Sequence, residues 1–165
     1  MKLLLCTLCA IGLGSFGVNA QTGADFSGTW KMDLSRSDAA AQGTPIGSVT
    51  MVIRQGADEV QIDTTQNGMT QTVTYLPEGT KQTVAEDTAG TFRWDGPQLV
   101  TNLVTHINKQ AVTVAEARRL NAAGTEMTVA VTLVVQHGYS GSTIAPGAKN
   151  PPNTATGTNV FLKAR

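Results

Sequence analysis

Apolar and polar residues alternate with a period of two along much of this chain, and short stretches containing Gly or Asn interrupt the alternation. Successive side chains of a β-strand point to opposite faces, so this alternation is typical of strands with one buried face. The clearest rows span residues 48–54, 60–65, 99–107 and 127–136. No segment keeps the 3.6-residue period of an amphipathic helix, and Thr and Val, which favour strands, are abundant. The sequence therefore predicts an all-β protein.

Further alternating segments bring the expected number of strands to eight to ten. They lie at residues 26–34, 69–76, 80–86, 91–94, 111–120 and 158–163. Turns are expected at 56–58, 66–68, 77–79, 95–97 and 122–124, where Gly or Asn permits a positive φ. Short connections join neighbouring strands antiparallel, and a meander of this length leaves two open edges unless it closes. We therefore expect an antiparallel up-and-down β-barrel, with a β-sandwich as the alternative.

The first twenty residues have the layout of a cleavable secretory signal. Lys2 gives a positive start, residues 3–13 form an apolar run, and Val18 and Ala20 place small side chains before the expected cleavage point. Both cysteines of the chain lie in this segment, so residues 21–165 would fold as a single domain without a disulfide. We expect export to the periplasm or to the extracellular space.

One long segment departs from the pattern of short connections. Residues 138–157 are rich in Gly, Ser, Thr, Asn and Pro and show no apolar alternation. Loops of this length are uncommon inside a compact domain, where they are functional or disordered. We expect a loop over 138–157 that is followed by a closing strand at 159–163. A functional loop at this place would lie over a barrel opening.

Charge and motif content exclude several classes of function. The 165 residues carry 12 basic and 12 acidic side chains, whereas nucleic-acid-binding domains are usually basic. Aromatic residues make up only 5% of the chain, whereas membrane-inserted barrels need aromatic girdles and an apolar outer band. Two histidines and the two signal-segment cysteines leave little for a metal site, and no phosphate-binding loop is present. We expect no metal, cofactor, nucleic-acid partner or membrane insertion, and the sequence leaves the oligomeric state open.

The segment Asp25-Phe26-Ser27-Gly28-Thr29-Trp30-Lys31 resembles the start of secreted bacterial lipocalin-like proteins of the calycin group, which open with F-S-G-T-W-K. Residues 92–99, with the pattern W-D-G-x-x-L, and residues 119–124 are similar to two later hairpins of that family. The resemblance implies a lipocalin-like barrel. In such a barrel Gly28 begins the first strand, and Trp30 closes the floor under a basic side chain from a late strand. By analogy with lipocalins, it also implies binding of small apolar molecules.

The residues expected to contact such a ligand are inward-facing side chains of different strands. They are Met51, Ile53, Tyr75, Trp94, Leu103 and Arg118. Trp94 precedes a turn and would belong either to the core or to the cavity mouth. Arg118 and Arg119 are expected on opposite faces of one strand. Arg118 would either stack on Trp30 or anchor a ligand carboxylate, and Arg165 competes for the place on Trp30.

The expected function is that of a noncatalytic carrier or sensor of a small apolar or amphipathic molecule. Two alternatives stay open. Small barrels can fill their interior with side chains, and a packed barrel would act as an envelope protein-interaction module through its surface or residues 138–157. The other alternative is an enzyme that uses Arg118, Glu116 or His137.

Overall fold

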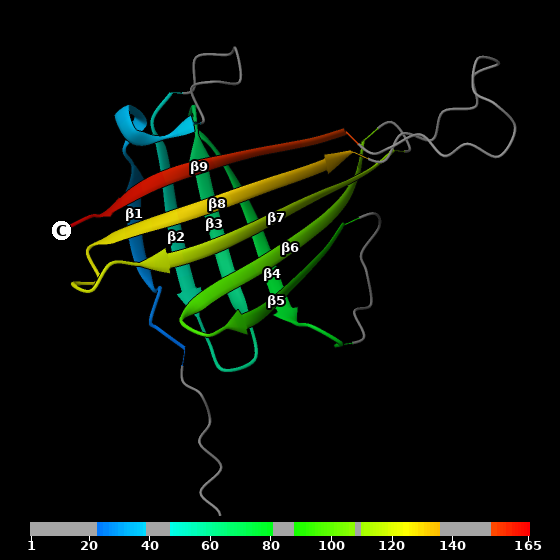
Figure 1. Ribbon diagram of the computed structural model, residues 1–165, viewed down its shortest axis with the longest axis horizontal. Coiled ribbons are helices and arrows are strands. Elements are labelled where there is room, and N and C mark those ends of the chain that lie inside the picture. Colours follow the sequence, from blue (N-terminus) through cyan, green and yellow to red (C-terminus); the bar gives the residue numbers. More distant parts are fainter. Residues whose placement is uncertain (1–22, 39–46, 81–87, 108–109, 136–152) are drawn as a thin grey trace, which may run out of the picture.

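A computed structural model of the chain describes residues 23–38, 47–80, 88–107, 110–135 and 153–165. Within these residues, nine strands in chain order form one closed barrel, with a single turn of 3₁₀ helix after the first strand (Figure 1). The elements are β1 (Gly28–Met32), η1 (Leu34–Arg36), β2 (Val49–Gln55), β3 (Val60–Gln66), β4 (Met69–Pro77), β5 (Thr88–Asp95), β6 (Gln98–Ile107), β7 (Gln110–Leu120), β8 (Glu126–Val135) and β9 (Asn153–Lys163). The expected β-barrel of eight to ten strands is confirmed.

The barrel has two distinct ends. In Figure 1, β2–β4 lie behind β6–β9 and cross them steeply. The β2–β3, β5–β6 and β7–β8 turns lie at the same end as the start of β1 and the end of β9. We call this the closed end, because residues 23–27 also lie there. The β3–β4 turn lies at the opposite end.

One pair of neighbouring strands departs from the predicted antiparallel arrangement. β4 and β5 run parallel, with Leu76 opposite Thr91 and Pro77 opposite Phe92. All other neighbouring pairs, including β1 with β9, are antiparallel. Strand directions cannot alternate around a closed ring with an odd number of members, so nine strands require at least one parallel pair. The expectation of a wholly antiparallel barrel is therefore wrong, and the turn at 77–79 does not form an antiparallel hairpin.

The last strand is longer than the sequence suggested. β9 begins at Asn153 and pairs with β8 from its first residue, opposite Val135. The expectation of a loop is therefore wrong for residues 153–157. This segment alternates threonines with Ala155 and Gly157, so it has the period of a strand without apolar side chains. The remainder of that expected loop, the expected strand at 81–86 and the expected signal segment 1–20 lie outside the described residues.

Apolar side chains pack the closed end of the barrel. Trp30 is fully buried, and its indole Nε1 donates a hydrogen bond to the carbonyl of Phe26 at 2.9 Å. The Nζ atom of Lys163 lies 5.2 Å from the centroid of the Trp30 ring. Neither Arg118 nor Arg165 takes this place, so both expectations for the cation over Trp30 are wrong. Gly28 has a φ of +131°, and a side chain there would approach Lys163 Cε at 3.0 Å, so glycine leaves room for the lysine.

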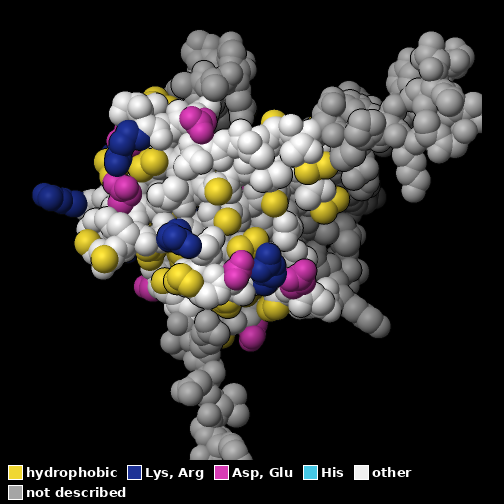
Figure 2. Space-filling model, viewed as in Figure 1, with side chains coloured by type: hydrophobic (Ala, Val, Ile, Leu, Met, Phe, Trp, Pro, Cys, Tyr) yellow, Lys and Arg dark blue, Asp and Glu magenta, His cyan; other side chains and the backbone are white. Residues whose placement is uncertain are grey.

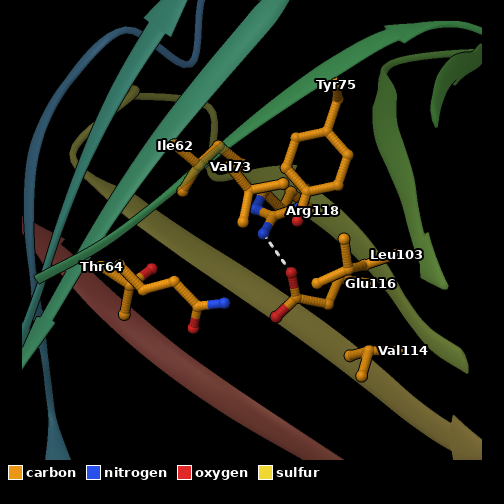
Figure 3. A pocket seen from close by; sticks show the side chains of 9 residues that line it. Ile62, Thr64, Val73, Tyr75, Leu103, Val114, Glu116 and Arg118 are labelled. Atoms are coloured by element: carbon orange, nitrogen blue, oxygen red, sulfur yellow. Dashed lines mark hydrogen bonds and ion pairs between the residues drawn. The ribbon is translucent and has the colours of Figure 1, made fainter. Parts of the chain in front are cut away.

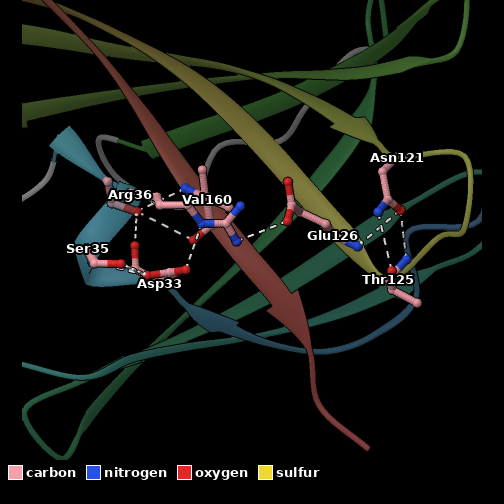
Figure 4. A network of polar contacts seen from close by, with 8 residues as sticks. Asp33, Ser35, Arg36, Asn121, Thr125, Glu126 and Val160 are labelled. Carbon is pink, nitrogen blue, oxygen red and sulfur yellow. Dashed lines mark hydrogen bonds and ion pairs between the residues drawn. The ribbon is translucent and has the colours of Figure 1, made fainter.

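A network of polar contacts holds η1 against the outside of the barrel (Figure 4). The backbone N–H of Asp33 donates to the carbonyl of Val160 on β9 at 2.8 Å. The Asp33 carboxylate accepts a hydrogen bond from the Ser35 backbone and pairs with Arg36 at 2.8 Å. Arg36 Nη2 also pairs with Glu126 Oε2 of β8 at 3.0 Å. The connection that leaves β1 is thereby fixed across β8 and β9.

The outer face of β6–β9 is mixed in character, with hydrophobic side chains in small separate groups (Figure 2). Val104 and Leu162 are the exposed large hydrophobic residues of these strands within the described ranges. No helix in the described part of the chain is both long enough and apolar enough to cross a membrane.

Candidate functional site

A cavity of about 210 Å³ lies inside the barrel between β3, β4, β6 and β7 (Figure 3). Its lining residues occupy alternate positions on each strand, because only every second side chain of a strand points inward. They are Ile62, Thr64, Gln71, Val73, Tyr75, Leu103, Val114, Glu116 and Arg118. Most of this lining is apolar, and the charged side chains both come from β7.

Arg118 is the most deeply buried charged residue in the described part of the barrel, with a side chain only 1% exposed. Its Nη1 donates a hydrogen bond to Thr101 Oγ1 at 2.6 Å, and its Nη2 pairs with Glu116 Oε2. Arginine stays protonated in proteins, so a buried guanidinium needs a compensating partner. Glu116, two residues earlier on the same face of β7, supplies that negative charge. Arg118 Nε has no hydrogen-bond partner within the described residues.

Tyr75 joins the same network from the opposite side of the cavity. Its hydroxyl is hydrogen-bonded with Thr101, which in turn accepts from Arg118. Burial raises the pKa of Tyr75 above its ordinary value, so the phenol keeps its proton at neutral pH. The ring lies against Gly90 of β5, where an added Cβ would come within 3.0 Å of Tyr75 Cδ1. A glycine at position 90 therefore gives the tyrosine its space.

A second hollow of about 410 Å³ lies beside the β3–β4 turn, at the end of the barrel opposite the closed end. Its lining consists of Thr64, Gln66, Asn67, Met69, Thr70 and Gln71. Thr64 and Gln71 also line the inner cavity, so the two spaces adjoin. Met69 is 75% exposed at this rim. A molecule held near Arg118 could therefore extend along β3 and β4 toward an apolar side chain at the surface.

The structure places three of the six predicted ligand contacts in the cavity lining, namely Tyr75, Leu103 and Arg118. Met51 and Ile53 face inward but are packed into the apolar core. Trp94 packs near Phe26, with ring centroids 6.0 Å apart, and is part of the closed end. Of the alternatives for Trp94, the structure thus gives core packing. Gly28 and Trp30 also lie at the closed end, as described above.

Sequence reasoning missed six lining residues as ligand contacts, although their positions carried a signal. These are Ile62, Thr64, Gln71, Val73, Val114 and Glu116. All of them share a face with a core or cavity residue two positions away. Glu116 stood two residues from Arg118 and was named only as a possible catalytic group. Arg118 is buried and Arg119 is exposed, so the expectation that they face opposite sides is confirmed.

The two charged side chains of the cavity are paired with each other. The Glu116 carboxylate accepts from the Arg118 guanidinium, which carries N–H donors and no acceptor. No group of three or more His, Cys, Asp or Glu side chains that could hold a metal occurs among the described residues. His137, the remaining residue named for catalysis, lies outside the described ranges.

The fold has counterparts among solved structures, although no protein-family model and no curated protein matches the sequence. A secretory abundant heat soluble protein of Ramazzottius varieornatus aligns over 87% of this chain and 98% of its own, with a TM-score of 0.55 and 13% identity. Secretory abundant heat soluble protein 4 of the same organism gives the same coverage, a TM-score of 0.52 and 16% identity. A mutant of the REP1-NXSQ fatty acid transporter covers 86% of this chain and 100% of its own, with a TM-score of 0.50 and 14% identity. At these identities the chain is similar to all three in its β-barrel fold.

Proposed function

We propose that this chain is an exported, noncatalytic protein that binds a small apolar or amphipathic molecule inside its barrel. The observation that carries the proposal is the internal cavity of about 210 Å³, whose apolar walls surround the Tyr75–Thr101–Arg118–Glu116 network. Small-molecule sites usually combine apolar walls with a few fixed polar groups. One protein of similar fold is named as a fatty acid transporter, which adds support. The resemblance of residues 25–31 to the start of lipocalin-like proteins also supports the proposal.

The size of the cavity sets the scale of the ligand. An engineered apolar cavity of about 150 Å³ binds benzene, whereas pockets for drug-sized molecules span about 300–1,000 Å³. The inner cavity, at about 210 Å³, would thus hold a group somewhat larger than benzene. A longer molecule would reach the second hollow at the β3–β4 rim.

The proposal is tested on residues 21–165 purified from the native host. Native mass spectrometry should show an added small mass that disappears under denaturing conditions, and the released molecule can then be identified. A clean apoprotein that also fails to enhance the fluorescence of a hydrophobic dye would support the packed-barrel alternative instead.

A pair of Val→Phe variants connects the bound molecule to the cavity. Val114→Phe places a ring in the cavity, whereas Val104→Phe places the same ring on the exposed outer face of β6. We expect loss of the bound mass from Val114→Phe and retention in Val104→Phe. Retention in both variants would place the ligand elsewhere and contradict the proposal.

Export is tested separately by N-terminal sequencing of the protein recovered outside the cytoplasm. The proposed signal predicts a mature chain that begins at Gln21. Recovery of the uncleaved chain in the cytoplasm alone would contradict this part of the proposal.

A further inference from the structure

We infer that the ligand has a polar end that donates a hydrogen bond and carries no negative charge, and that the Glu116 carboxylate accepts this hydrogen bond. The inference rests on the proposed function, because it names the chemical class of the molecule that the cavity binds. Simple members of this class are amphipathic alcohols and amines.

The first argument is the charge of the cavity wall. Arg118 and Glu116 are the charged residues among its lining, and they are paired with each other. The fixed charges of the wall therefore sum to zero. A ligand carboxylate would add a negative charge next to that of Glu116, and like charges at short range disfavour each other's ionised form.

The second argument is the accessibility of the two partners. The Arg118 side chain is 1% exposed, whereas that of Glu116 is 22% exposed. The guanidinium donates one hydrogen bond from Nη1 to Thr101 and one from Nη2 to Glu116, and its Nε is buried. A ligand that enters the cavity therefore meets the negative member of the pair before the positive member.

The third argument is the free accepting capacity of Glu116. Oε2 accepts from Arg118, and no hydrogen bond to Oε1 occurs among the described residues. Figure 3 shows the second carboxylate oxygen turned away from Arg118, toward the side of the cavity where Thr64 lies. An ionised carboxylate has no proton to donate and accepts hydrogen bonds only. An O–H or N–H group of the ligand satisfies this oxygen, whereas another carboxylate cannot.

The test uses three ligands with the same six-carbon tail: hexanol, hexylamine and hexanoate. Each is titrated into isotope-labelled protein of residues 21–165 at pH 7, and the amide shifts of β7 give the dissociation constant. We expect hexanol and hexylamine to bind at least about tenfold more tightly than hexanoate, which corresponds to about 1.4 kcal/mol. Hexanol and hexylamine distinguish a neutral donor from a cationic one.

A matched pair of Glu→Gln variants assigns the preference to Glu116. Glu116→Gln leaves the Arg118 charge uncompensated, so hexanoate should become the tightest of the three ligands. Glu126→Gln removes the same charge from the outer surface, where Glu126 pairs with Arg36, and should keep the wild-type order. If Glu116→Gln does not fold, the wild-type series decides alone.

The possible results separate the inference about the ligand, the role of Glu116 and the proposed function. Wild-type protein that binds hexanoate as tightly as hexanol or hexylamine would overturn the inference, and so would a co-purified molecule with a carboxylate or phosphate at its polar end. A Glu116→Gln variant that folds and keeps the wild-type order would overturn the role of Glu116. If none of the three ligands binds and no molecule co-purifies, the proposed function itself fails.

Discussion

Arg118 and Arg54 pair with carboxylates in opposite settings of the same barrel. Arg118 is buried in the interior with Glu116, whereas Arg54 pairs with Asp63 at 2.5 Å on the outer face of β2 and β3. Removal of one partner of a buried pair leaves the other charge without compensation, but an exposed charge is rehydrated by water. Solvent exposure therefore decides how much each pair contributes to stability.

Two Arg→Leu variants test this difference. Arg118→Leu should lower the free energy of unfolding by about 3 kcal/mol, and Arg54→Leu by less than about 1 kcal/mol. Urea denaturation of both variants beside the wild type measures the two changes. Equal changes would mean that Arg118 is hydrated in solution, contrary to its burial in the structure.

Gly90 provides a second prediction for a single residue. A Cβ at this position would lie 3.0 Å from the Thr74 carbonyl oxygen and 3.0 Å from Tyr75 Cδ1, and a backbone atom cannot move away easily. Gly90→Ala should therefore cost about 1–2 kcal/mol of unfolding free energy through overpacking. The neighbouring change Thr91→Ala is the control and should cost less. A neutral Gly90→Ala variant would show that β4 and β5 separate readily.

For single residues, the sequence predicted which side chains face the barrel interior. It did not predict whether an inward side chain lies in the packed core or beside the cavity. Alternation places Met51, Tyr75 and Leu103 on inward faces, and the structure agrees. Met51 nevertheless lies in the packed core, whereas Tyr75 and Leu103 lie beside the cavity. Depth along the barrel depends on the stagger between strands, which is fixed only when the ring closes. No local pattern contains that information.

The β3–β4 turn shows how strongly local sequence sets one connection. Asn67 and Gly68 are the two central residues and both have positive φ, 51° and 78°. Glycine adopts this conformation freely, asparagine tolerates it, and other residues resist it. Asn-Gly between alternating segments is the strongest hairpin signal in a sequence. This turn is the one that bounds the second hollow.

Substitutions in this turn should separate backbone conformation from packing. A Cβ at Gly68 would meet no atom within 4 Å, so the cost of Gly68→Ala comes from the positive φ alone. We expect a loss of about 1 kcal/mol from the free energy of unfolding. Asn67→Gly, by contrast, should change it by less than about 0.5 kcal/mol. A neutral Gly68→Ala variant would require the turn to adopt another conformation.

Strands with an apolar face were predictable, and strands defined by their partners were not. The segments that became β2, β3, β6 and β8 each carry a clear apolar row. The first part of β9 contains only small and polar residues, and its conformation depends on the ladder that β8 offers. The parallel contact between β4 and β5 likewise follows from the number of strands in the ring. Neither feature is encoded in a local pattern.

The free energy of unfolding of the whole molecule should be constant over a middle range of pH and should decrease at acid and at alkaline pH. Hydrogen bonds from Ser35, Arg54 and Ser27 lower the pKa values of Asp33, Asp63 and Asp25, respectively. Their stabilising contributions are complete above the unfolded-state value of about 4 and are lost as the pH falls through the lowered values. Burial raises the pKa of Tyr75, so its contribution is complete below about pH 10 and is lost as the pH rises further.

Urea midpoints measured across the pH range test this expectation. The midpoint should be nearly constant between about pH 5 and pH 9 and should fall on both sides. Tyr75→Phe should flatten the alkaline fall, and Asp63→Asn should reduce the acid fall. An unchanged alkaline limb in Tyr75→Phe would contradict the assignment to this residue.

The barrel cannot close until β9 has been made, because β1 pairs with β9. The ring closes through Trp30 opposite Lys163, which joins its first strand to its last. During synthesis, a chain that already contains β8 but not yet β9 leaves β1 and β8 with unpaired backbone edges. Such edges pair readily with other molecules. A chain truncated before β9 should therefore aggregate.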